Sequence, residues 1–241
     1  METARVLKLR GHNPIIYEAS DRLGGTFIPA SAESYKGKLR DLLKWYIKKM
    51  DDLKIKVHLN KKIKDLSKFE GKDIVIATGS SARKLNIPGF EKTVEACEYL
   101  SGKKVGKNVV VVGGGLTGCE VAYELALKGK NVSIVEMQDD LIKQKGVCLA
   151  NSSYLREYFA WKKVPVYFSQ KLAEVNDDGI VIKDKDGIKT RIPCDSVISS
   201  AGYIPTPLAK NGGRVHLVGD CFKVGNLRSV IWRAYEAAMQ I

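Results

Sequence analysis

The chain has 241 residues, of which 44% are hydrophobic, and its 40 Lys and Arg against 27 Asp and Glu give a formal net charge of +13. No apolar run approaches the roughly 20 residues of a membrane span, and no charged-then-apolar export pattern opens the chain, so we expect a cytoplasmic protein. The lysines are scattered and lack interleaved aromatic residues, which argues against nucleic acid as a partner.

The cysteines are spaced too widely to form a redox or metal centre. No two are closer than 22 positions along the chain: they are Cys97, Cys119, Cys148, Cys194 and Cys221. This spacing excludes a Cys-x-x-Cys redox pair and gives no zinc or iron–sulfur ligand pattern. We therefore predict no metal site and small buried thiols.

The amino-terminal segment is repeated later in the chain. Residues 1–23 align without a gap with residues 119–141, at an offset of 118, and ten of the 23 positions are identical. In this alignment Glu18 matches Glu136, and Met1 falls immediately after the third glycine of a glycine fingerprint. We therefore expect the first half to lack its initial strand and glycine loop. A helix at about 35–54 and an apolar strand that ends in a glycine turn, 73–79, are expected to follow.

The strongest local signal is the stretch from residue 108 to 136. Its four valines, 109–112, predict a strand buried on both faces, and the apolar spacing after Gly118 predicts a helix that ends at Gly129. A second strand is predicted at 132–135, and Glu136 follows it directly. Strand, glycine turn, helix, strand and acid follow one another in the order of a dinucleotide-binding βαβ unit.

Each glycine of this turn has a physical task if the assignment holds. Gly113 makes the tight turn, Gly115 lets pyrophosphate approach the backbone, and Gly118 allows the helix to contact the strand. The helix amino terminus offers N–H groups to the phosphates. The predicted NAD(H) site is therefore the whole turn: Gly113, Gly114, Gly115, Leu116, Thr117 and Gly118.

Glu136 is placed to accept hydrogen bonds from the adenosine ribose. Because a carboxylate there would repel a 2′-phosphate, and no arginine follows within several residues, NADH is favoured over NADPH. No residue is assigned a catalytic acid or base role, because hydride transfer is the chemistry of the cofactors.

The remainder of the second half continues the pattern. We expect a helix near 152–161, strands around 164–175 and 180–183, and a hairpin turn at Asp186-Gly187. Residues 195–202 then repeat the strand and glycine turn of residues 73–79. The sequence therefore predicts an α/β protein with two Rossmann-like dinucleotide-binding domains, the first without its initial strand and glycine loop.

Several motifs together resemble the two-dinucleotide-binding-domain flavoproteins over nearly the whole chain. They are Glu18 with Asp21-Arg-Leu-Gly-Gly25, Ala77-Thr-Gly-Ser80, the glycine fingerprint, Ala201-Gly-Tyr-Ile-Pro205 and Val218-Gly-Asp-Cys221. Within this group, the motifs resemble most the carboxy-terminal part of the 2-enoate reductase and 2,4-dienoyl-CoA reductase family. That family is related to old yellow enzyme and trimethylamine dehydrogenase.

This resemblance implies a discontinuous FAD-binding-type domain, 1–90 with 208–241, and an inserted NAD(P)H-binding domain, 91–207. It implies cofactor contacts from Gly202 and, for FAD, from Glu18, Arg22, Gly24, Gly25, Ala77, Thr78, Gly79 and Asp220. NADH would reduce FAD, and electrons would pass through a 4Fe-4S cluster to FMN in an amino-terminal barrel domain that is not in this chain. An activated carbon–carbon double bond would then be reduced.

The chain is thus expected to be a fragment of such a reductase that is inactive or weakly active by itself. Two alternatives stay open: a reductase of a protein electron carrier, and a nucleotide-binding module without turnover. The 118-residue repeat predicts poor FAD binding, because the loop that presents N–H groups to the pyrophosphate has no counterpart in the first half. The gap in the sheet is expected to allow self-association. Exposed boundaries are expected at Pro88-Gly89 and around residues 211–213.

Overall fold

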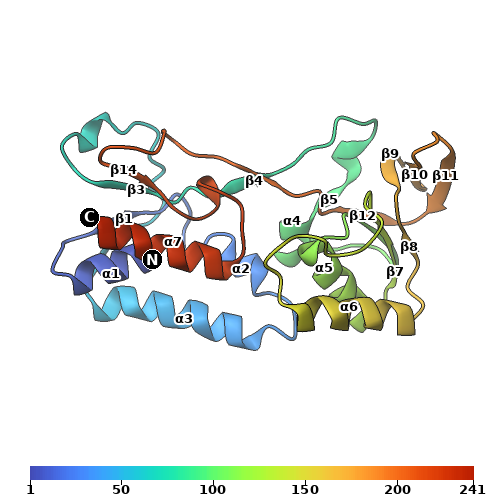
Figure 1. Ribbon diagram of the computed structural model, residues 1–241, viewed down its shortest axis with the longest axis horizontal. Coiled ribbons are helices and arrows are strands. Elements are labelled where there is room, and N and C mark those ends of the chain that lie inside the picture. Colours follow the sequence, from blue (N-terminus) through green and yellow to red (C-terminus); the bar gives the residue numbers. More distant parts are fainter. The chain divides into compact units, whose positions relative to one another are not determined.

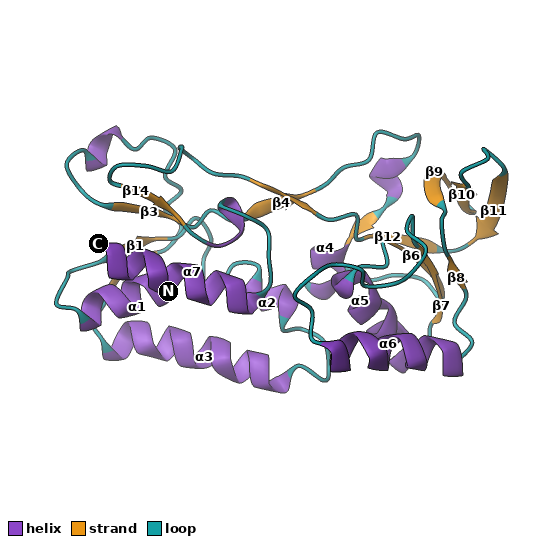
Figure 2. Cartoon of the chain, in the orientation of Figure 1, coloured by secondary structure: helices purple, strands orange, loops and turns teal.

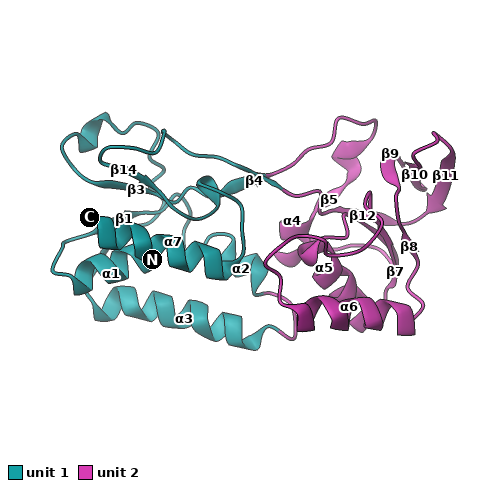
Figure 3. Ribbon diagram, in the orientation of Figure 1, with its two compact units in different colours: residues 1–31, 36–81, 203–241 teal, residues 32–35, 82–202 magenta.

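The computed structural model describes all 241 residues, and the chain forms two compact units (Figure 1 and Figure 3). Unit 1 comprises residues 1–31, 36–81 and 203–241, and unit 2 comprises residues 32–35 and 82–202. Figure 2 shows helices and strands in both units. The predicted α/β class is confirmed.

Unit 2 is built on a five-stranded sheet with the order β5-β12-β6-β7-β8, in which all neighbours are parallel. Its strands are β5 (Val94–Glu95), β6 (Asn108–Val112), β7 (Asn131–Val135), β8 (Val166–Tyr167) and β12 (Ser196–Ser199). The valine-rich strand β6 lies in the centre and pairs on both sides. The prediction of a strand at 109–112 is confirmed.

Strand β6 is buried on both faces because its valines alternate between two cores. Val109 and Val111 pack in a cluster with Leu125 of α5 and Phe159 of α6. Val110 and Val112 pack in a second cluster with residues of an antiparallel sheet. All four valines are at most 7% exposed. This pattern is typical of a central parallel strand covered on both sides.

Helices cover one face of this sheet and the antiparallel strands cover the other. The helices are α4 (Ala96–Leu100), α5 (Leu116–Leu127) and α6 (Leu149–Trp161), with a short 3-10 helix at Phe90–Lys92. The antiparallel sheet has the order β11-β10-β9. Its strands are β9 (Lys171–Asn176), β10 (Gly179–Lys183) and β11 (Lys189–Pro193), and the Asp186-Gly187 turn joins the last two as expected.

Unit 1 contains two separate two-stranded parallel sheets, β1-β2 and β14-β3. The strands are β1 (Ile15–Tyr17), β2 (Lys56–His58), β3 (Ile74–Ile76) and β14 (Val215–Leu217). The helices are α1 (Glu2–Leu9), α2 (Phe27–Ala30), α3 (Gly37–Asp52) and α7 (Leu227–Gln240), with 3-10 turns at Ser67–Phe69 and Gly219–Cys221. Helix α1 packs against α7 and α3 (Figure 1), and Thr3 Oγ1 donates to the Ala234 carbonyl at 3.0 Å.

The chain passes between the units near Ser81 and Gly202, whereas the sequence predicts domain limits at residues 90 and 207. Residues 82–90 belong to unit 2, where the Pro88 carbonyl accepts from the Val175 N–H of β9 at 3.0 Å. Residues 203–207 belong to unit 1, where the Thr206 N–H donates to the Gly79 carbonyl at 3.1 Å. Strands β4 (Ser80–Ala82) and β13 (Tyr203–Pro205) pair in a two-stranded sheet.

Candidate functional site: a glycine turn with a buried carboxylate

The glycine turn joins the carboxyl end of β6 to the amino end of α5. Gly113 has φ +107°, and a side-chain carbon there would lie 2.3 Å from the Ser200 carbonyl oxygen. Its N–H donates to the Val135 carbonyl at 2.8 Å, which ties the turn to β7. Only glycine meets both the left-handed backbone and the close approach. The structure therefore explains the residue type at position 113.

Gly118 lies in the first turn of α5 and lets this helix approach the glycine turn. A side-chain carbon at this position would lie 1.9 Å from the Gly113 carbonyl oxygen. Helix α5 begins after Gly115, which supplies no side-chain cap. No side chain therefore caps the first backbone N–H groups of the helix, which is also the arrangement at phosphate-binding helix termini.

Glu136 follows β7 directly and is only 7% exposed. Its Oε2 accepts from the Gly114 N–H at 2.5 Å, and its Oε1 accepts from the Gln138 N–H at 2.7 Å. The structure therefore brings the predicted acid and the predicted glycine turn into direct contact. Each carboxylate oxygen keeps further lone pairs, which can accept hydroxyl donors.

Three residues at this site escaped the sequence prediction. The Ile142 N–H donates to the Gly114 carbonyl at 2.8 Å, and Leu141 is 2% exposed beside the same turn. The Gln144 side chain lies over Gly115, where an added side-chain carbon would be 3.3 Å from Gln144 Oε1. Of these three residues, only Leu141 lies within the sequence repeat, where it matches Leu23.

Gly202 lies two residues beyond the segment that meets the glycine turn. The Ser200 N–H donates to the Val112 carbonyl at 2.8 Å, and the Ser200 carbonyl faces Gly113. The Gly202 carbonyl accepts from the Arg83 N–H at 2.9 Å. The end of β12 is therefore placed beside the turn, and a cofactor contact by Gly202 stays a prediction.

Cys119 lies beneath the turn but is a structural thiol. It is fully buried, and its Sγ donates to the Gly114 carbonyl at 3.3 Å. Burial, reinforced by the negative charge of Glu136, raises the pKa of the Cys119 thiol to about 12. Since the thiolate is the reactive form, Cys119 is inert at neutral pH.

In unit 1, Glu18 follows β1 as Glu136 follows β7. Its Oε1 accepts from the N–H and the hydroxyl of Ser20, both at 2.8 Å. Arg22 forms an exposed ion pair with Asp21, in which Nε and Oδ1 are 2.9 Å apart. Gly24 packs so closely that a side-chain carbon would lie 2.9 Å from Ile28 Cγ1, whereas the space beside Gly25 is open.

The Ala77-Thr78-Gly79 segment and Asp220 meet in unit 1 at the carboxyl end of β3. Thr78 Oγ1 donates to the Thr206 carbonyl at 2.7 Å. Asp220 accepts from the Gly225 N–H at 3.1 Å and from the Ser80 hydroxyl at 3.4 Å. The Ser80 contact was not predicted. No hydrogen bond joins Glu18 or Arg22 to this cluster, and their roles in FAD binding stay predictions.

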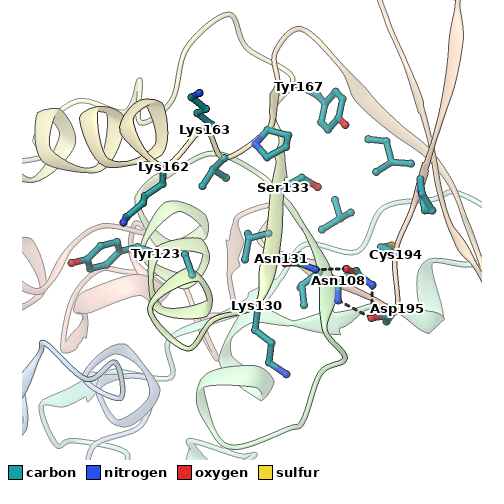
Figure 4. Close-up of a pocket in the computed structure, with 18 of the residues that line it drawn as sticks. Asn108, Tyr123, Lys130, Asn131, Ser133, Lys162, Lys163, Tyr167, Cys194 and Asp195 are labelled. Atoms are coloured by element: carbon teal, nitrogen blue, oxygen red, sulfur yellow. Dashed lines mark hydrogen bonds between the residues drawn. The ribbon is translucent and has the colours of Figure 1, made fainter.

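A large recess of about 1400 Å³ lies in unit 2 at the other end of the strands (Figure 4). Three of its polar side chains bind one another: Asn131 Nδ2 donates to Asn108 Oδ1 at 2.8 Å, and Asn108 Nδ2 donates to Asp195 Oδ2 at 3.1 Å (Figure 4). Ligands of parallel α/β sheets bind at the carboxyl ends of strands, where the glycine turn lies. The recess therefore lies away from the predicted nucleotide site.

No group of three or more His, Cys, Asp or Glu in the structure could hold a metal ion. No helix combines the length and the apolar composition that crossing a membrane requires.

Curated relatives of the chain are longer oxidoreductases. Cinnamate reductase of Clostridium sporogenes is 36% identical in an alignment that covers 100% of this chain and 37% of that protein. NADH oxidase of Thermoanaerobacter brockii is 28% identical, with 100% of this chain and 39% of that protein covered. The chain thus spans less than two fifths of the length of these relatives. Their names confirm the predicted enzyme class and the resemblance to 2-enoate reductases.

Solved structures confirm the Rossmann-like flavoprotein fold. A 2-naphthoyl-CoA reductase in complex with 2-naphthoyl-CoA matches with a TM-score of 0.85 and 28% identity, over 100% of this chain and 38% of that one. Thioredoxin reductase of T. acidophilum shares the fold with a TM-score of 0.78 at 19% identity, over 99% of this chain and 92% of that one. The family described as pyridine nucleotide-disulphide oxidoreductase matches residues 2–233. The chain therefore belongs to the pyridine nucleotide-disulphide oxidoreductase family.

Proposed function

We propose that unit 2 is an NADH-binding domain and unit 1 an FAD-binding-type domain of a flavin-dependent reductase. In the whole protein, hydride passes from NADH to FAD and feeds reduction of an activated carbon–carbon double bond of the 2-enoate or 2,4-dienoyl-CoA type. The observation that carries the NADH assignment is the bond from the Gly114 N–H to the Glu136 carboxylate beside the open amino terminus of α5. The relatives named for cinnamate, a 2-enoate, and for 2-naphthoyl-CoA support the substrate class.

The residues of unit 2 bind and orient the nucleotide and do not exchange protons with it. The first N–H groups of α5 hold the pyrophosphate, and Glu136 accepts hydrogen bonds from the ribose hydroxyls. Because Glu136 is buried and fixed by two backbone donors, it cannot turn away from a 2′-phosphate. The two negative charges would then repel each other at short range, which favours NADH over NADPH.

The residues of unit 1 fit only part of an FAD molecule. Glu18 and Asp220 are available for its two ends, but no glycine turn precedes α1 within unit 1. We therefore assign no electron-transfer step to unit 1 as it stands. In the proposed whole protein, a further barrel domain binds FMN and a 4Fe-4S cluster. The protein acts in the cytoplasm, with neither nucleic acid nor membrane as a partner.

Calorimetric titration of the chain with NADH and with NADPH tests this proposal. We expect NADH to bind at least about tenfold more tightly, a difference of about 1.4 kcal/mol. Glu136→Ala should weaken NADH binding by a similar factor and remove the preference, whereas Glu157→Ala, which changes an exposed carboxylate on α6, should change neither. Equal or tighter binding of NADPH by the unmodified chain would contradict the assignment of Glu136.

A further inference from the structure

The segment that follows Glu136 folds back over the glycine turn. Leu141 packs so closely that a side-chain carbon on Gly114 would lie 2.5 Å from Leu141 Cδ2. The Ile142 N–H donates to the Gly114 carbonyl at 2.8 Å. Leu141 and Ile142 are 2% and 5% exposed, and both belong to the buried cluster that contains Val109. Buried side chains and one backbone hydrogen bond therefore fix this segment to the turn.

Helix α6 contributes a further contact to the same segment. Arg156 Nε donates to Asp140 Oδ1 at 3.1 Å, and Arg156 Nη2 donates to the Leu141 carbonyl. Asp139 and Lys143 form an ion pair in which Oδ1 and Nζ are 2.6 Å apart. These contacts restrict the backbone of the segment before any nucleotide is bound.

Ile142 has an unusual backbone conformation. Its φ is +51°, in the left-handed region that β-branched residues rarely adopt. Such a conformation persists only where the surrounding contacts impose it, and it is common at segments that contact ligands. The contacts here are the buried side chain and the bond to the Gly114 carbonyl. The chain reverses at Ile142, and Gln144, two residues later, lies over the glycine turn.

The Gln144 carboxamide lies on the side of Gly115 from which a pyrophosphate would approach. A side-chain carbon added to Gly115 would have three atoms of this carboxamide as its nearest neighbours: Oε1 at 3.3 Å, Nε2 at 3.8 Å and Cδ at 3.9 Å. In a dinucleotide-binding turn, the missing side chain of this glycine gives the pyrophosphate room to approach the backbone. A pyrophosphate bound at the turn would therefore lie next to Gln144.

The Gln144 carboxamide is free to bind such a ligand. No hydrogen bond joins it to another protein group, and the side chain is exposed. Its nitrogen carries two N–H donors, and a hydrogen bond from such a donor to an ionised phosphate is stronger than one between neutral groups. Because the backbone is fixed and the side chain is exposed, rotation of the side chain alone can direct Nε2 to the ligand.

We propose that Gln144 donates from its side-chain amide to a pyrophosphate oxygen of the nucleotide bound at the amino end of α5. The pyrophosphate then has two sets of donors, the first N–H groups of the helix and the Gln144 amide. Glu136 contacts the ribose that distinguishes NADH from NADPH, whereas Gln144 contacts a part that both nucleotides share. This inference rests on the proposed NADH-binding function of unit 2. It adds affinity without adding preference for NADH.

Two substitutions at position 144 and one control test this role. Gln144→Ala removes the donor. Gln144→Glu keeps the shape of the side chain but replaces the amide with a carboxylate, which repels the pyrophosphate. Gln240→Ala is the matched control, because it removes an exposed carboxamide from α7 in unit 1. Since both glutamines are exposed, we expect all three variants to unfold at the same urea concentration as the unmodified chain.

Calorimetric titration with NADH, NADPH and ADP-ribose measures the contact, because all three contain the pyrophosphate and ADP-ribose lacks the nicotinamide. We expect Gln144→Ala to weaken the binding of each about five- to tenfold, since one hydrogen bond to a charged group is lost. Gln144→Glu should weaken it at least about 30-fold, because a repulsion is added. The ratio of NADH to NADPH affinity should stay unchanged, and Gln240→Ala should have no effect.

Unchanged or tighter binding in Gln144→Ala overturns the inference, because Gln144 would then be a bystander or an obstruction. Equal affinities in Gln144→Ala and Gln144→Glu contradict the donor role. A loss that spares ADP-ribose, or a changed ratio of NADH to NADPH affinity, also overturns the inference, because the contact would then lie elsewhere on the nucleotide. If the unmodified chain binds neither NADH nor ADP-ribose, the proposed function of unit 2 fails and this inference fails with it.

Discussion

Units 1 and 2 contain similar sequence segments, but the parallel sheets to which these segments belong differ in size. Ten of 23 positions are identical between residues 1–23 and 119–141, and both segments form a helix followed by a strand of a parallel pair. In unit 2 this pair belongs to a continuous five-stranded sheet, and in unit 1 it belongs to a sheet of two strands. Similar local sequence therefore gives similar local structure, while burial depends on the strand next to it.

The acids that follow the equivalent strands β7 and β1 also differ in their hydrogen-bond partners. Unit 2 has turn, helix terminus and acid in one hydrogen-bonded group, in which the Gly114 N–H meets Glu136. In unit 1 the equivalent acid, Glu18, binds Ser20 of its own loop. The equivalent acids therefore have different partners: a backbone N–H of the glycine turn in unit 2, and Ser20 in unit 1.

The largest expected effect comes from Gly118→Ala. The new methyl group would lie 1.9 Å from the Gly113 carbonyl oxygen, so α5 must move away from the turn. We expect NADH affinity to fall at least about 100-fold, a loss of about 2.7 kcal/mol or more. Gly37→Ala is the matched control in unit 1, because its nearest neighbour would be Arg40 Nη2 at 3.7 Å. Unchanged NADH affinity in Gly118→Ala would show that the turn is not the binding site.

A matched pair of isoleucines measures the difference in packing. Ile134→Ala removes a completely buried side chain and should lower the free energy of unfolding of unit 2 by about 3 kcal/mol. Ile16→Ala changes the equivalent, partly buried residue and should cost unit 1 about 1 kcal/mol. Hydrogen exchange resolved by unit would measure both. Equal costs would mean that unit 1 already packs β1 as unit 2 packs β7.

A smaller effect is expected at Glu124, a buried carboxylate on α5. Burial raises the pKa of Glu124, but hydrogen bonds from Ser34 and Lys128 outweigh it and hold this pKa below its ordinary value. The resulting stabilisation is present above the unfolded pKa, near 4.3, and is lost as the pH falls through the lower folded pKa. Ser34→Ala, which removes a bond of 2.8 Å, should therefore cost about 1 kcal/mol at pH 7.

Urea unfolding at pH 7 and at acid pH would measure this effect. The difference between Ser34→Ala and the unmodified chain should shrink once Glu124 is protonated in both. Ser101→Ala, at an exposed position in unit 2, serves as the control. A difference that stays constant with pH would show that the hydroxyl does not act through the charge of Glu124.

The sequence was sufficient for the central βαβ unit because its signals are local. Four valines, the glycine turn and Glu136 stand within one stretch, and the structure confirms the strand, the helix and the closing strand. The hairpin at Asp186-Gly187 is confirmed for the same reason.

Other features depend on contacts between distant segments and left no signal in the sequence. Pro88 is exposed, as expected at a boundary, but Gly89 packs so closely on β9 that a side-chain carbon would lie 1.9 Å from the Val175 carbonyl oxygen. The placement of Gln144 over Gly115 and the bond from Ser80 to Asp220 likewise follow from tertiary structure. The exposed Asn211, Gly212 and Gly213 remain the expected site of proteolysis.

Binding of NADH and of FAD by one preparation of the unmodified chain tests the central claim most directly. NADH is titrated by calorimetry, and the flavin retained after incubation with FAD and gel filtration is measured by its visible absorbance. We predict saturable NADH binding at one site and retention of less than about a tenth of an equivalent of FAD, because several charged hydrogen bonds to the pyrophosphate are missing. Near-stoichiometric FAD with NADH-dependent dye reduction would contradict the account.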